Sequence, residues 1–182
     1  MHILGGAILA GFASRYPDKV EKMTLIAPAG IMEKDLALLP IVKTPILGEI
    51  FLYTFGRKVL LDFSTASHLK SEAESPDVAQ FNTRLGFHLK HHPGILEAIR
   101  STVFYFDFKN QAPAFRALEK THAGKVLCIW GEKDKVVPTD LHLALQELIP
   151  SVKMQLRRNF SHSIVLEDSS MVVDLVSTFF FQ

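Results

Sequence analysis

Met1-His2-Ile3-Leu4-Gly5-Gly6 opens the chain, and a run of small apolar residues from Ala7 to Ala13 follows it directly. Adjacent glycines allow a tight turn and a close approach of backbone, as is needed where a helix packs tightly against a sheet. We expect the helix to end near Tyr16, because Pro17 cannot continue it. The start of the chain therefore predicts a buried helix next to a β-sheet.

Three short segments further along predict the strands of that sheet. They lie at residues 23–27, 125–130 and 153–157, and the first two end in glycine- or proline-containing turns. The second segment is apolar almost throughout and is interpreted as a buried strand that ends in a glycine turn at Gly131.

Helical spacing of apolar residues follows each of the last two strands. Residues 139–148 form an amphipathic pattern, with Thr139 or Asp140 available as the N-terminal cap, and residues 171–180 form a closing helix. Alternation of strand, turn and helix is the signature of a parallel sheet covered by helices. The sequence therefore predicts an α/β fold.

A long insertion interrupts this alternation between residues 31 and 115. Its apolar residues follow helical spacing, as at 47–55 and 81–89, and the segment is rich in leucine and phenylalanine. Prolines divide it into short helical pieces, at Pro40, Pro45, Pro76 and Pro93. We expect a separate helical region here, with residues 1–30 and 116–182 forming the sheet-bearing core.

Three segments resemble one family in order and in spacing. Met1–Gly6 resembles the strand-to-helix elbow that carries the nucleophile of an α/β-hydrolase, usually Gly-His-Ser-x-Gly-Gly. Gly131–Pro138 resembles the loop with the acid, Gly-x-x-Asp-x-x-x-Pro, and Ser161–Glu167 resembles the loop with the base, Gly-His-x-x-x-x-Glu. On these motifs the chain is identified as a member of the α/β-hydrolase fold superfamily, similar to its serine esterases and lipases and corresponding to the C-terminal half of the fold.

The resemblance implies a role for each residue of the three motifs. Asp134 is implied as the triad acid and His162 as the base, while Ile3 occupies the position of the nucleophile. The backbone amide of Leu4 is implied as one donor of the oxyanion hole. Two simpler interpretations stay open, in which Asp134 only forms a turn and His162 is an ordinary loop histidine.

Isoleucine at position 3 conflicts with the family's chemistry, because a hydrocarbon side chain cannot attack a carbonyl carbon. Ser14 lies well inside the predicted helix and Cys128 inside a predicted strand, so neither is expected to replace the nucleophile. The second oxyanion donor is expected from a loop that would precede Met1. The ancestral activity implied is hydrolysis of carboxylic esters or related acyl substrates. We expect this chain to be inactive or impaired, and the alternative is a non-catalytic pseudohydrolase that acts as a binding or interaction module.

The resemblance also places residues 31–115 where the family has a helical cap, or lid. Their leucine and phenylalanine content would suit a small apolar ester or acyl substrate, although the same side chains could simply bury the cap against the core. His88, His91 and His92 raise the possibility of a metal site. Without cysteines or carboxylates at ligand spacing, a solvated helix end before Pro93 is the favoured interpretation. We predict no metal and no cofactor.

Composition limits the remaining classes of function. The 182 residues are 48% hydrophobic, which is enough for a packed core, and the net charge of +1 carries no basic stripe for nucleic acid. A single cysteine excludes an internal disulfide and favours a reducing compartment, so we predict a cytoplasmic protein. An alternative treats residues 1–14 as a targeting segment, but no lysine or arginine precedes the apolar run.

The predicted sheet is smaller than that of a complete α/β-hydrolase. In the family, the strand that ends in the nucleophile would pair beside residues 23–27, so we expect this strand to have an uncovered edge. Such an edge is a template for self-association or for pairing with a partner chain. Three explanations stay open: a fragment, a degenerate paralogue, and a short protein completed by a second chain. The substrate, the oligomeric state and the organism cannot be deduced from the sequence.

Overall fold

The computed structural model contains two separately packed units. The residues that it describes are 2–31, 39–67, 76–92 and 94–182. The first unit comprises Met1–Glu33 and Asp107–Gln182, and the second comprises Lys34–Phe106. The helical insertion predicted at residues 31–115 overlaps the second unit, and its role as a lid stays a prediction.

A parallel sheet forms the centre of the first unit. Within the described residues it has the order β1-β2-β3, with β1 at Met23–Ile26, β2 at Val126–Gly131 and β3 at Lys153–Arg157. Every residue of β2 is buried, and its Cys128 pairs with Leu25 of β1 and with Met154 of β3. The three predicted strands and their parallel arrangement are confirmed.

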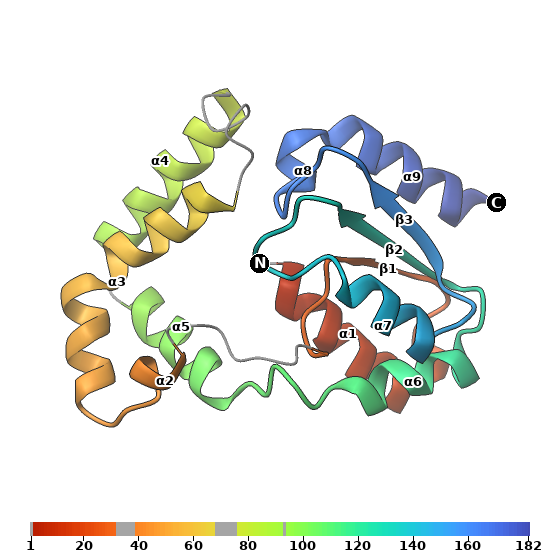
Figure 1. Cartoon of the computed structure of the whole chain (residues 1–182), viewed down its shortest axis with the longest axis horizontal. Coiled ribbons are helices and arrows are strands. Elements are labelled where there is room, and N and C mark those ends of the chain that lie inside the picture. Colours follow the sequence, from red (N-terminus) through yellow and green to blue (C-terminus); the bar gives the residue numbers. More distant parts are fainter. Residues whose placement is uncertain (1, 32–38, 68–75, 93) are drawn as a thin grey trace. The chain divides into compact units, whose positions relative to one another are not determined.

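Helices cover both faces of this sheet. Figure 1 shows α8 and α9 on one side and α1, α6 and α7 on the other. The helical segments of the unit are α1 (His2–Arg15), the 3-10 turn η1 (Pro17–Lys19), α6 (Ala112–Thr121), α7 (Leu141–Leu148), α8 (Ile164–Glu167) and α9 (Ser169–Phe181). The α/β class predicted from the alternation of strands and helices is confirmed.

Small residues allow α1 to lie close to the sheet. Ala7, Ala10 and Ala13 are almost completely buried on one face of the helix. Gly6 approaches the turn after β1 so closely that an added Cβ would lie 2.5 Å from the Cβ of Pro28. A side chain at position 6 would therefore push the start of α1 away from the end of β1.

The opposite face of the sheet is packed by the C-terminal helices. Leu127 and Ile129 of β2 form a buried cluster with Ile164 of α8 and with Val172 and Phe179 of α9. Burying apolar side chains of this size contributes about 1.5–3 kcal/mol each to folding. The cluster holds the segment between β3 and α9 in place, and that segment carries the predicted triad histidine.

Asp140, one of the two residues predicted as the cap of α7, is its N-cap residue, but its side chain makes no capping hydrogen bond. The hydroxyl of Thr139 instead points back to the end of β2, 3.2 Å from the carbonyl oxygen of Gly131 and 3.0 Å from that of Glu132. The hydroxyl therefore stabilises the loop that follows β2 rather than the helix.

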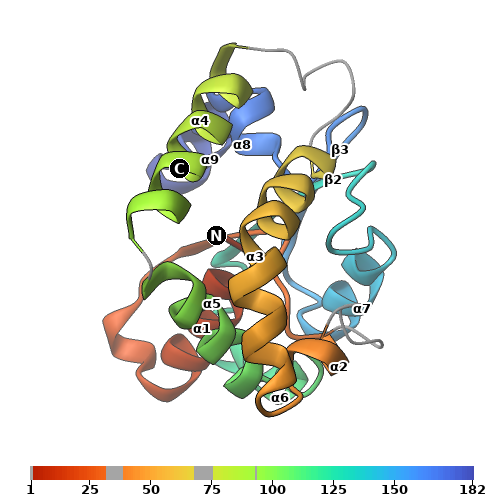
Figure 2. The same cartoon turned by 90° about the vertical axis from the view of Figure 1, so that its left-hand side faces the viewer.

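The second unit consists of packed helices. They are α2 (Leu39–Val42), α3 (Leu47–Ala66), α4 (Pro76–His91) and α5 (Gly94–Tyr105). Figure 2 shows the long helix α3 beside α5, and an ion pair of 3.0 Å joins Glu49 of α3 to Arg100 of α5. Leu52 and Leu96 are buried in the unit. The helices predicted at residues 47–55 and 81–89 are confirmed, and no described helix has both the length and the hydropathy of a membrane span.

Candidate active site

Asp134 lies in the loop that directly follows β2. Both oxygens of its carboxylate are used: Oδ1 accepts hydrogen bonds from the amides of Val136 (2.8 Å) and Val137 (2.9 Å), and Oδ2 contacts the ring of His162. The two amides fix the orientation of the carboxylate without using its second oxygen. Asp134 is thus a turn-forming aspartate and also the hydrogen-bond partner of a histidine, so the turn and the acid–base pairing coexist.

His162 and Asp134 form a buried pair. Nδ1 of His162 lies 2.7 Å from Oδ2 of Asp134, and the side chains are 6% and 0% exposed, respectively. Because a carboxylate only accepts hydrogen bonds, the hydrogen between them belongs to Nδ1. In the neutral ring the lone pair is then on Nε2, the nitrogen that a general base of this kind uses.

The loop that carries His162 is itself held by a carboxylate. Glu167, at the end of α8, accepts hydrogen bonds from the amide of Ser161 (2.8 Å) and from the hydroxyl of Ser161. The backbone carbonyl oxygen of Ser163 accepts hydrogen bonds from the amides of Leu166 and Glu167. These bonds join the short helix α8 to the loop. His162 therefore lies between two residues whose positions are fixed by hydrogen bonds.

The acid loop and the histidine loop are also joined through the backbone. The amide of Lys133 donates to the carbonyl oxygen of Phe160 at 2.8 Å. At Gly131, an added Cβ would lie 2.3 Å from the carbonyl oxygen of Ser161 and 2.5 Å from that of Phe160. Only glycine at position 131 leaves room for the backbone at Phe160 and Ser161 to pass this close to the end of β2. This close approach brings Asp134 and His162 together.

The third triad position predicted from the sequence lies in the first turn of α1. Ile3 and Leu4 are the second and third residues of this helix, whereas Met1 and the side chain of Ile3 lie outside the described part of the chain. The first amides of an α-helix have no intrahelical acceptor, so the amide of Leu4 is suited to bind an oxyanion. Gly6 against Pro28 places this turn at the carboxyl end of β1.

All three positions therefore belong to the same edge of the sheet. Asp134 follows β2, His162 follows β3, and the first turn of α1 is next to the residues that follow β1. Figure 1 shows the start of α1 at the edge toward which the arrows of β2 and β3 point. In open parallel sheets this edge is where ligands bind.

The other nucleophilic side chains considered from the sequence are occupied or buried. The hydroxyl of Ser14 donates to the carbonyl oxygen of Gly11 at 3.0 Å within α1. Cys128 is completely buried in β2, and burial raises the pKa of its thiol far above the usual value. A thiol that stays protonated is a poor nucleophile, so Cys128 is not suited to act as one.

The three histidines near Pro93 lie at the exposed end of α4. His91 is the last residue of the helix, and the rings of His88 and His92 stack with their centres 5.3 Å apart. Among the described residues, no group of three or more histidines, cysteines or carboxylates has the arrangement of a metal site. The helix end that the sequence predicted here is confirmed.

Two features of the site were not predicted from the sequence. They are the role of Ser161 as the hydrogen-bond partner of Glu167, and the need for glycine at position 131. A signal for the first was present, because Ser161 stands where the motif usually has glycine. The second depends on a crossing of two loops, which short-range patterns do not reveal.

Comparisons with known proteins agree with this fold. The family model described as alpha/beta hydrolase fold matches residues 2–169. No curated protein matches.

Several solved structures share the fold. A meta-cleavage product hydrolase of Pseudomonas fluorescens IP01 is 22% identical with a TM-score of 0.62, over 96% of this chain and 61% of that one. A serine hydrolase of Cycloclasticus zankles is 15% identical with a TM-score of 0.70, over 97% and 60% of the two chains. A carboxylesterase of Nitrososphaera gargenis is 19% identical with a TM-score of 0.65, over 97% and 61%. The chain therefore spans less than two thirds of the length of these structures.

Proposed function

This chain belongs to the alpha/beta hydrolase family, and from that premise we propose that Asp134 and His162 are the acid and the base of a hydrolytic triad whose nucleophile position is residue 3. The observation that carries the proposal is the buried 2.7 Å contact between Nδ1 of His162 and Oδ2 of Asp134. In such a triad the carboxylate fixes the tautomer of the histidine, and the histidine accepts the proton of the nucleophile.

The reaction for which this arrangement is suited is hydrolysis of a carboxylic ester or a related acyl substrate. A serine at position 3 would attack the carbonyl carbon while its proton passes to Nε2 of His162, and the amide of Leu4 would donate to the oxyanion. The resemblance in fold to a carboxylesterase and to a meta-cleavage product hydrolase is consistent with this class of substrate. Substrate binding is assigned to the helical segment 31–115, as a lid rich in leucine and phenylalanine.

Isoleucine at position 3 stops this reaction at its first step, because no acyl-enzyme can form on a hydrocarbon side chain. The chain thus keeps the acid–base pair of a hydrolase without its nucleophile. Changing Ile3 to serine supplies the nucleophile, with the amide of Leu4 as the one oxyanion donor assigned here. In this fold a second donor comes from a loop earlier in the chain. Losing one such donor costs roughly 10²–10³-fold in kcat.

Turnover of p-nitrophenyl butyrate by the whole chain and its variants tests this proposal. We expect the chain with Ile3 to hydrolyse the ester at a background rate that His162→Ala leaves unchanged. We expect Ile3→Ser to add little turnover, all of which is lost in the double variant Ile3→Ser/His162→Ala. Ester hydrolysis that depends on His162 while Ile3 is still present would contradict the proposal, because it would require another nucleophile.

A second candidate function is that of a non-catalytic interaction module, and the edge of the sheet favours it. In the described sheet β1 pairs only with β2, so its other edge presents unpaired backbone groups. Ile8 and Phe12 on α1 and Tyr16 directly after it are 61%, 46% and 50% exposed and follow each other at a spacing of four residues. We propose self-association or binding of a partner chain along β1 and this stripe.

Sedimentation of the whole chain at micromolar concentration distinguishes the two candidates. The interaction module predicts a dimer or larger species whose fraction rises with protein concentration, because association follows mass action. The double variant Ile8→Glu/Phe12→Glu should shift that species toward the monomer. The control Leu143→Glu, at an exposed position of α7, should leave the distribution unchanged. A stable monomer throughout the concentration series would remove the second candidate and leave the first untouched.

A further inference from the structure

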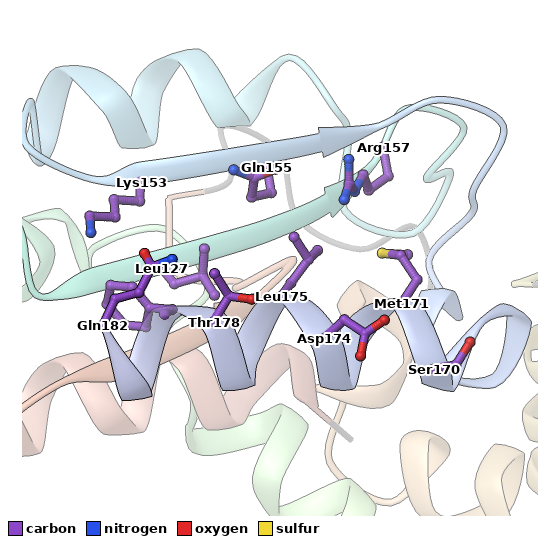
Figure 3. A pocket seen from close by; sticks show the side chains of 11 residues that line it. Leu127, Lys153, Gln155, Arg157, Ser170, Met171, Asp174, Leu175, Thr178 and Gln182 are labelled. Carbon is purple, nitrogen blue, oxygen red and sulfur yellow. The ribbon is translucent and has the colours of Figure 1, made fainter.

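A cavity of about 430 Å³ lies between β3 and α9 in the first unit. Neither Asp134 nor His162 lines it. Figure 3 shows Lys153, Gln155 and Arg157 along one wall and residues of α9, among them Asp174 and Leu175, along the other. Leu127 of β2 lies at its base. The cavity therefore carries polar side chains on both walls, with the basic ones on β3, and apolar side chains such as Leu127 and Leu175 between them.

The alternation of a β-strand explains this wall. Residues 153, 155 and 157 are two positions apart, so their side chains project from the same face of β3. That face is directed at α9, where Leu175 and Met171 supply apolar surface to the same cavity. Two cationic side chains and one amide side chain thus form a row along β3 and face the apolar side chains of Leu175 and Met171.

Arg157 has unused hydrogen-bonding capacity at this cavity. Its Nε is buried and has no hydrogen-bond partner among the described residues. A buried N–H without an acceptor costs free energy, about 1–3 kcal/mol and more for a charged group. Arg157 lines the cavity, and a carboxylate bound there matches the planar fork of its guanidinium with two parallel hydrogen bonds. A rotation of the side chain would bring the buried Nε to one oxygen of that carboxylate.

The other charges of the cavity define the ligand further. Nζ of Lys153 lies 5.2 Å from the centre of the Phe179 ring, and neither Lys153 nor Arg157 forms an ion pair with a described carboxylate. Asp174 on α9 is the acidic residue of the lining. Among the side chains of the lining, two cations and one anion leave a net charge of +1, which favours a singly charged anion over a multiply charged one.

We propose that this cavity is a binding site for a small amphipathic monocarboxylate. Arg157 binds the carboxylate, Lys153 adds attraction, and the hydrocarbon part of the ligand lies against Leu127 and Leu175. Asp174 weakens the binding by repulsion. This site is independent of the triad assignment, since it shares no residue with it.

Titration of the ¹⁵N-labelled whole chain with hexanoate, followed by NMR, tests the proposal. We expect saturable shifts of amides in β3 and α9. Arg157→Gln should weaken the affinity at least about tenfold, because a charged hydrogen bond is lost. Arg157→Lys should give an intermediate loss, because it keeps the charge without the fork. The matched control is Arg158→Gln, at the adjacent exposed position outside the cavity, and it should leave the affinity within about twofold.

Further titrations test the contributions of the carboxylate and of the hydrocarbon part of the ligand separately. Asp174→Asn should tighten hexanoate binding, since it removes the repulsive charge. Hexan-1-ol, which lacks the carboxylate, and inorganic phosphate, which lacks the hydrocarbon, should both fail to saturate the site. Absence of saturable shifts in β3 and α9, equal affinity of the folded Arg157→Gln variant, or equal binding of phosphate would each overturn the proposal.

Discussion

At the scale of single residues, the site depends on one aspartate that serves two purposes. Oδ1 of Asp134 organises the loop after β2 through two backbone amides, and Oδ2 holds His162. The turn-forming role and the triad role were alternatives on the sequence alone. The geometry removes the conflict, because a carboxylate has enough acceptor sites for both.

Asp134→Ala should therefore destabilise the fold as well as the site. It leaves the amides of Val136 and Val137 without their acceptor, and removes the partner of a buried histidine. We expect the free energy of unfolding to fall by roughly 3 kcal/mol. Urea unfolding followed by the fluorescence of Trp130, the single tryptophan, measures this.

Asp140→Ala is the matched control for that measurement. Asp140 lies six residues further on, is exposed, and makes no capping hydrogen bond despite its N-cap position. We expect a change of no more than about 0.5 kcal/mol. If the two variants lost the same stability, the carboxylate of Asp134 would not be the organising group of the loop.

At the scale of elements, the packing of α1 on the sheet determines where the first turn of this helix lies. The sequence predicted the helix correctly from its glycines and alanines. It did not distinguish the glycine that packs from the glycine that does not: Gly6 contacts Pro28, whereas the space around Gly11 is open. The same limit applies to the start of α7, where the sequence left Thr139 and Asp140 as alternatives. Asp140 is the N-cap residue, and the hydroxyl of Thr139 bonds to carbonyls brought near by the loop after β2.

Alanine substitutions at these two glycines should have opposite effects. Gly6→Ala places a Cβ 2.5 Å from that of Pro28 and should lower the free energy of unfolding by roughly 1–3 kcal/mol. Gly11→Ala, on the same helix with nothing within 4 Å, should raise it by about 0.5–1 kcal/mol. Parallel urea titrations of the two variants check the sign. A stabilising Gly6→Ala would mean that α1 does not lie this close to β1.

At the scale of the whole molecule, the family and the order of its motifs could be predicted from the sequence. The first two strands were predictable as short apolar runs, whereas the third alternates polar and apolar residues. The two loops were predictable because each carries a motif with defined spacing. The cavity beside β3 could not be predicted, since Lys153 and Arg157 meet α9 only after the chain has folded. The crossing at Gly131 escaped prediction for the same reason: it joins two loops 30 residues apart.

The proposed function depends on residue 3 and His162 belonging to one triad. A cysteine at position 3 tests this claim, because the reactivity of its thiol depends on His162 and needs no oxyanion hole. A thiol beside a triad histidine has a lowered pKa, about 3.5–7.5 instead of about 8.5, and reacts faster at neutral pH. The native Cys128 does not interfere, because burial raises the pKa of its thiol. Ile8→Cys, exposed on the same helix, serves as the control position.

The rate at which iodoacetamide alkylates the Ile3→Cys variant at pH 7 is the direct test of this claim. We expect His162→Ala and His162→Gln each to slow it by about tenfold or more, and to leave the rate of Ile8→Cys unchanged. Equal rates for Ile3→Cys with and without His162, in folded protein, would contradict the assignment of residue 3 and His162 to one triad.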